Sequence, residues 1–115
     1  MFDFEKLDVY QKAKSFNSQV YQYIQAHKSI DSTTKNQLRR ASLSIMLNIA
    51  EGSSRFSKPD RRNFYVIARG STFECVAIFD FMKEQNLLKE DLHSELYLKC
   101  EEISKMIYAM IKNLS

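Results

Sequence analysis

Glycine and proline are nearly absent from this chain, whose 115 residues include two glycines and one proline. These residues make up roughly 7% and 5% of average proteins, and they concentrate in turns. A chain with so few turn residues has few turns, so its secondary-structure elements must be long. The scarcity favours helices over a sandwich or barrel, which needs a turn after every short strand.

Long apolar runs are also absent. No run approaches the roughly 20 residues of a membrane-spanning helix, and Met1–Phe4 lacks the basic and apolar regions of a secretory signal. We therefore expect no membrane contact and a cytoplasmic protein. In that reducing compartment, Cys75 and Cys100 are more simply interpreted as buried thiols than as a disulfide.

The composition is that of a folded protein, with 44% hydrophobic and 27% charged residues. A chain of this length makes one domain, here residues 1–115. Apolar periodicity predicts four helices. The first covers about Leu7–His27, and the second runs from a cap within Ser29–Ser32 to Gly52–Ser54, where it frays. The third covers Ser57–Gln85 and the fourth Glu90–Asn113. Asn86 is the expected C-terminal cap of the third helix.

Each predicted helix carries at least one apolar line. The fourth has the most regular seam: Leu92, Leu96, Cys100, Ile103, Ile107, Met110 and Leu114. The second has a core line at Leu38, Ala41, Ile45 and Ile49 and a further line at Leu43, Met46, Leu47 and Ala50. The third has one line at Phe64, Ile67, Ser71, Cys75, Ile78 and Met82, and another at Val66, Phe73, Val76 and Phe79.

Four long helices with short connections predict an all-α, antiparallel up-down four-helix bundle. The additional apolar lines on helices two and three exceed what a monomer core needs. We expect a homo-oligomer with closed symmetry to bury them. The alternative is a thick monomer core with some exposed aromatic residues.

Positive charge is concentrated in the middle of the chain. Residues 35–69 contain eight basic and two acidic residues, whereas the rest contains nine basic and twelve acidic ones. Arginine suits bidentate contact with phosphate or carboxylate. The candidate nucleic-acid-binding residues are Arg39, Arg40, Arg55, Lys58, Arg61 and Arg62.

Aromatic residues accompany part of this cluster. Phe56, Phe64 and Tyr65 lie near the predicted turn between helices two and three and offer stacking surfaces for nucleic acid. Arg39 and Arg40 lie early in helix two, so the cluster forms two patches if the hairpin is antiparallel. The simpler alternative is a solvated charged face.

The sequence gives no support for catalysis. Glu90-Asp91-Leu92-His93 matches the Glu-x-x-His spacing of di-iron bundles, but no second such pair is present. The two glycines lie eighteen positions apart and cannot form a phosphate-binding loop. We expect no enzyme activity, no cofactor and no metal.

Four polar residues fall at or near the apolar faces: Asn48, Glu51, Arg69 and Glu74. They could form a polar pocket, or a structural network in which Arg69 pairs with Glu51 or Glu74, since an unpaired buried charge is costly. We favour the structural network. Gly70, in mid-helix, is expected to mark a close helix crossing.

Several short motifs together resemble a known family. They are Phe4–Tyr10 (FEKLDVY), Leu38–Ile45 (LRRASLSI), Asn48–Gly52 (NIAEG) and Ala68–Ser71 (ARGS). In this order, they resemble the bacterial four-helix-bundle proteins encoded in 23S rRNA intervening sequences, over nearly the whole chain. Met46 stands where that family commonly has proline, which should leave helix two straighter.

The resemblance implies a ring-shaped pentamer. It also implies kinship with the accessory variability protein of diversity-generating retroelements, whose basic surface engages nucleic acid and a reverse transcriptase. The signature residues carried over by position are Arg39, Arg40, Asn48, Glu51, Arg69 and Gly70. We therefore expect a non-enzymatic homo-oligomer that binds RNA or DNA, with a protein-interaction scaffold as the alternative.

Overall fold

The computed structural model describes residues 1–114, and within them it contains helices and no strands. The elements are the short 3-10 helix η1 (Asp3–Lys6) and the α-helices α1 (Asp8–Ala26), α2 (Ser32–Ser54), α3 (Lys58–Glu84) and α4 (Glu90–Asn113). The prediction of an all-helical chain with four long helices is confirmed. η1 was not predicted.

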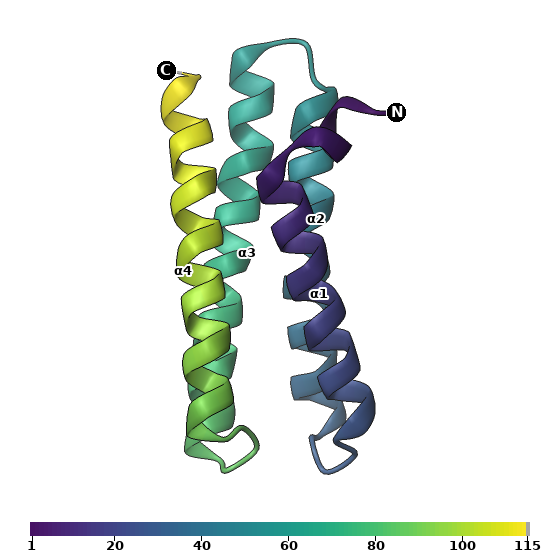
Figure 1. Cartoon of the computed structure of the whole chain (residues 1–115), viewed down its shortest axis with the longest axis vertical. Coiled ribbons are helices and arrows are strands. Elements are labelled where there is room, and N and C mark those ends of the chain that lie inside the picture. Colours follow the sequence, from purple (N-terminus) through teal and green to yellow (C-terminus); the bar gives the residue numbers. More distant parts are fainter. Residues whose placement is uncertain (115) are drawn as a thin grey trace.

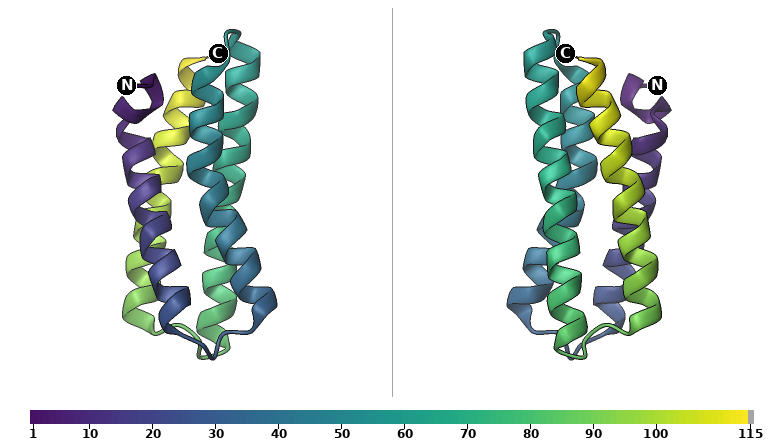
Figure 2. Two further views of the ribbon diagram at one scale, coloured as in Figure 1. Left: turned by 90° about the vertical axis from the view of Figure 1, so that its right-hand side faces the viewer. Right: turned by 90° about the vertical axis from the view of Figure 1, so that its left-hand side faces the viewer.

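The four helices pack side by side into an elongated bundle with principal dimensions of 44 × 24 × 21 Å (Figure 1). Consecutive helices run in opposite directions along the long axis. Figure 2 shows η1 and the end of α4 at the same end of the bundle as the α2–α3 connection. We call this end the α2–α3 end; the α1–α2 and α3–α4 connections lie at the opposite end.

The helix boundaries follow from local capping chemistry. The Asp31 carboxylate accepts from the Thr34 amide at the start of α2, and the Ser57 hydroxyl accepts from the Asp60 amide at the start of α3. After α3, Asn86 adopts a left-handed φ of 60°. Its amide donates to Lys83 O, and that of Leu87 donates to Met82 O, which completes a Schellman motif. The predicted role of Asn86 is thereby confirmed.

One contiguous core runs between the helices. The expected core line of α2 is buried, as are the central residues of the α4 seam, Leu96, Cys100, Ile103 and Ile107. Cys75 and Cys100 are free thiols inside this core, as predicted. Burial raises the pKa of Cys100 to about 12 and that of Cys75 further, so both thiols stay protonated at neutral pH.

The predicted inner face of α3 needs correction. Phe64 is partly exposed and Ile67 is exposed. Ser71, Cys75 and Met82 of the predicted line are buried, and the inner face is completed by Tyr65, Ala68, Thr72 and Phe79. α3 has apolar residues around most of its circumference, so periodicity alone did not identify the side that meets α2 and α4.

The expected glycine at a close crossing is Gly52 and not Gly70. A Cβ atom built at Gly70 would meet nothing within 4 Å in the described chain. One built at Gly52 would lie 2.6 Å from Tyr65 Cε1 and 3.2 Å from the Arg61 carbonyl oxygen. Close approach of α2 to α3 therefore depends on Gly52.

Candidate nucleic-acid interface

Four of the six predicted basic residues meet at the α2–α3 end. Arg55 follows the last residue of α2, Lys58 begins α3, and Arg61 and Arg62 lie one turn further along α3. Lys58 and Arg62 are exposed, and Arg61 is partly buried. The short connection brings these cations together because it leaves only three residues between the two helices.

Two of the arginines are fixed by contacts within the turn. The Arg55 guanidinium lies 4.7 Å from the centre of the Phe64 ring and makes an ion pair with Glu51 at 3.1 Å. The Arg61 Nε donates to the Arg55 carbonyl oxygen at 2.6 Å. These contacts hold the guanidinium groups in place before any ligand binds, which lowers the entropic cost of binding.

Aromatic rings surround the same turn. Phe56, in the connection between α2 and α3, is fully exposed. Phe2, in the N-terminal segment, is 73% exposed. The Arg55 guanidinium lies over the ring of Phe64. Tyr65 is buried, so the prediction that it offers a stacking surface is wrong. The contribution of Phe2 was missed, since more than 50 residues separate it from the turn.

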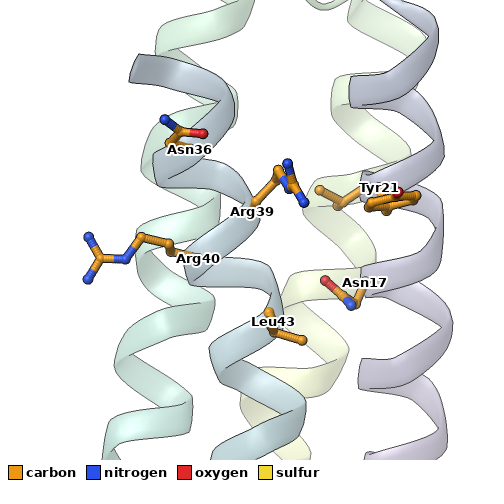
Figure 3. A pocket seen from close by; sticks show the side chains of 7 residues that line it. Asn17, Tyr21, Asn36, Arg39, Arg40 and Leu43 are labelled. Carbon is orange, nitrogen blue, oxygen red and sulfur yellow. The ribbon is translucent and has the colours of Figure 1, made fainter. Parts of the chain in front are cut away.

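Arg39 and Arg40 form a separate site. They lie about 24 Å from Arg55 along the axis of α2, at 1.5 Å per residue. Arg39 points across to Tyr21 of α1, whose ring centre lies 5.5 Å away, whereas Arg40 points outward (Figure 3). The groove between α1 and α2 at this position has a volume of about 680 Å³ and is partly lined by Asn17. The six basic residues are thus divided into two patches.

The predicted ion pairs of Arg69 do not form. Glu51 pairs with Arg55, and within residues 1–114 neither Arg69 nor Glu74 has an ion-pair partner within 4 Å. The Arg69 guanidinium instead lies 4.7 Å from the centre of the Phe73 ring and 5.4 Å from that of Tyr108. Its Nε is buried and has no hydrogen-bond partner among the described residues.

Asn48 takes part in a smaller polar network between α2 and α3. Its amide nitrogen donates to Ser44 O at 2.8 Å and lies 2.9 Å from Ser44 Oγ. The Ser44 hydroxyl is in turn 2.8 Å from that of Ser71. This network satisfies polar groups at the helix contact, and Ser44 and Ser71, for which no polar role was predicted, provide most of it.

His93, part of the Glu-x-x-His motif, lies against α3. Its Nε2 is 2.7 Å from Asp80 Oδ1, and its ring is nearly buried. Within residues 1–114, no cluster of three or more His, Cys, Asp or Glu side chains could hold a metal ion. The two buried thiols are protonated, so their environment does not favour nucleophilic chemistry.

Fold and site together define a class of small all-α protein with a basic, aromatic-rich end. The sequence model described as "23S rRNA-intervening sequence protein" matches residues 5–109. The chain therefore belongs to the family of 23S rRNA-intervening sequence proteins, as its motifs predicted. No curated protein matches the chain.

A solved structure supports the fold. The chain is similar to a protein of unknown function from the S23 ribosomal protein family of Bacteroides thetaiotaomicron VPI-5482, with a TM-score of 0.84 and 20% identity. The match covers 90% of this chain and 98% of the other. Within residues 1–114, no helix is both long and apolar enough to cross a membrane.

Proposed function

We propose that this protein binds RNA or DNA without catalysing a reaction, through the basic α2–α3 end of its bundle. The observation that carries the proposal is the gathering of Arg55, Lys58, Arg61 and Arg62 around one turn. Phosphate contacts supply most of the affinity of sequence-independent nucleic-acid binding. Two pre-positioned guanidinium groups next to two exposed cations suit such contacts.

The proposal includes assembly of several copies into a cytoplasmic homo-oligomer. α3 supports it with an outward-facing apolar stripe of Val66, Gly70, Phe73, Ala77 and Phe81, all exposed in the protomer. The spacing is that of a second helical seam. We name these residues the α3 stripe, and a second copy would bury them. The family resemblance makes a ring-shaped pentamer our preferred arrangement, and a reverse transcriptase a partner by analogy.

Arg39 and Arg40 favour a second candidate function. They lie apart from the basic turn, beside the groove between α1 and α2. In a protein-interaction scaffold, they would contact a neighbouring subunit or an acidic partner protein. Nucleic-acid binding that is unaffected by their substitution would agree with this role.

Salt titration tests the nucleic-acid proposal. If each of the four turn cations neutralises one phosphate, the logarithm of the binding constant should fall with the logarithm of salt concentration with a slope of about −3. Arg61→Glu plus Arg62→Glu should weaken binding to short single-stranded RNA and DNA at least tenfold. It should also make the slope shallower, reducing its magnitude by about 1.5 to 2.

Lys28→Glu plus Lys89→Glu is the matched control. It changes net charge equally, but these exposed lysines lie in the α1–α2 and α3–α4 connections, at the opposite end of the bundle from the α2–α3 end. The control should bind nearly as well as the parent protein. Equal losses in both variants would reduce the effect to net charge, and unchanged binding by the Arg61/Arg62 variant would refute the proposed function.

A further inference from the structure

A groove opens at the α2–α3 end between the N-terminal segment, the end of α2 and the connection to α3. It has a volume of about 710 Å³, and Phe2, Phe4 and Phe56 contribute three aromatic rings to its walls. We propose that this groove is the site for an unpaired base of single-stranded nucleic acid, stacked on Phe2 and Phe56. This inference rests on the proposed function and specifies which form of nucleic acid binds.

The N-terminal wall of the groove is held in place. The Phe4 ring packs edge-on against Tyr10 with the centres 4.8 Å apart, and Phe2 stacks on Phe4 at 6.0 Å. The amide of Glu5 donates to Phe2 O, and Gln11 Nε2 donates to Glu5 O at 2.9 Å. The segment therefore presents Phe2 from a fixed turn, although the ring itself is largely exposed.

Phe56 also lines the groove, and within residues 1–114 its ring takes no part in the hydrophobic core. It is fully exposed in the turn, where a polar residue would be better solvated. Proteins that bind single strands use exposed aromatic rings as stacking platforms. Such a platform accepts any base, because every base has a π-face. Its neighbour Arg55, also part of the groove wall, adds a guanidinium plane that can stack on a base.

The charges in the groove favour a base over a phosphate. Arg55 and Arg61 line it, but so do Glu51 and Asp3, so its lining is formally neutral. Lys58 and Arg62 do not line the groove, and together with Arg55 and Arg61 at its wall they remain available to the backbone phosphates on either side of the base. A neutral aromatic groove beside free cations fits a strand that places a base inside and its phosphates outside.

The test compares three substitution states at one position. Single-stranded 15-nucleotide oligo-U and oligo-dT, and a DNA duplex of equal length, are titrated against the full protein at several salt concentrations. Phe56→Leu keeps the apolar bulk but removes the ring, and should weaken single-strand binding by about fivefold to a hundredfold. Phe56→Tyr should retain the affinity. Phe2→Leu should behave as Phe56→Leu does.

The salt slope separates stacking from charge. Phe56→Leu should leave it unchanged, since stacking releases no counterions, and duplex binding should be weaker than single-strand binding and insensitive to this change. If Phe56→Leu binds as the parent does while Arg61→Glu plus Arg62→Glu loses binding, the stacking site is wrong and the proposed function stands. If neither variant alters binding, both fail. If Phe56→Leu instead lowers the oligomer mass, the ring is a subunit contact and the inference is overturned.

Discussion

Gly52 lies where α2 packs tightly against Tyr65 and Arg61 of α3. Its side-chain position is filled by the Tyr65 ring and by the Arg61 backbone, neither of which is free to move: Tyr65 is buried, and the carbonyl belongs to a helix. A residue usually unfavourable within a helix is therefore required at this point. The basic turn and the helix contact are coupled here, because the backbone of Arg61 lies against Gly52 while its side chain belongs to the basic turn.

Gly52→Ala should lower the free energy of unfolding by about 1 to 2 kcal/mol. The added methyl group would lie 2.6 Å from the buried Tyr65 ring, so we expect an overpacking cost in the upper part of the usual range, about 2 to 3 kcal/mol. The gain in helix propensity of about 1 kcal/mol offsets only part of this cost. Urea denaturation followed by circular dichroism measures the change. Ser53→Ala, one residue further along α2 in a partly exposed position, is the control and should be neutral or slightly stabilising. A Gly52→Ala protein as stable as the parent would contradict the close contact.

Arg69 shows that the sequence can indicate a need for charge compensation without identifying the partner that provides it. Its place near an apolar face was predictable, and so was the need to compensate its charge. The choice of partner was not, because carboxylates and aromatic rings were both available at helical spacing. Phe73 follows Arg69 by four residues on α3, and Tyr108 completes the contact from α4. That second ring requires knowledge of how the two helices are aligned.

At the scale of single helices, the sequence determines the ends better than the faces. Asp31, Ser57 and Asn86 cap their helices through hydrogen bonds to nearby backbone groups. Local chemistry was therefore sufficient to predict a cap within Ser29–Ser32, a third helix opening at Ser57 and the role of Asn86. The face of α3 depends on its neighbours. Its apolar residues form both the buried line and the exposed α3 stripe, and only packing against α2 and α4 distinguishes the two.

The cap of α2 should make stability depend on pH in acid. The hydrogen bond from the Thr34 side chain, followed by that from its amide, lowers the pKa of Asp31 in the folded chain. Because the folded pKa is the lower one, the stabilisation is complete above the ordinary aspartate value of about 4 and is lost as the pH falls through the lowered value.

Asp31→Asn keeps a capping oxygen but cannot titrate in this range. The urea midpoint should therefore fall less between pH 6 and pH 3 for Asp31→Asn than for the parent. The pKa values of Glu90 and Glu95 are also lowered, mainly by hydrogen bonds from Lys83 and Gln19 respectively. Both glutamates are present in the two proteins, so their effects cancel in the comparison. Parallel declines of the two proteins would show that Asp31 contributes nothing to the acid response.

At the scale of the whole molecule, the cations and the N-terminal aromatic residues of the candidate interface differ in how far the sequence could predict them. The cations of the α2–α3 connection are close in sequence, so their clustering followed from one predicted turn. The N-terminal phenylalanines reach the same end only because η1 folds onto α2, a contact between segments more than 40 residues apart. Arg39 and Arg40 show the converse, since the helical rise of α2 separates them from the turn although they are close to it in sequence.

The α3 stripe provides the test of assembly. Light scattering of the parent protein at micromolar concentration should give a multiple of the 13.5 kDa chain mass. Val66→Glu plus Phe81→Glu should lower it towards 13.5 kDa, because each substitution replaces apolar area worth about 1.5 to 3 kcal/mol with a carboxylate that has no partner in the seam. Both side chains are about half exposed in the protomer, so the bundle itself should remain folded, which circular dichroism verifies.

Leu98→Glu is the matched control for this experiment. Leu98 is more exposed than either stripe residue, but it lies on α4, outside the α3 stripe. If exposed apolar area alone drove association, this substitution would dissociate the protein as effectively as the stripe variant. Retention of the mass by Leu98→Glu together with its loss in the stripe variant would assign the contact to α3. A parent protein of 13.5 kDa would instead make the stripe an exposed face of a monomer.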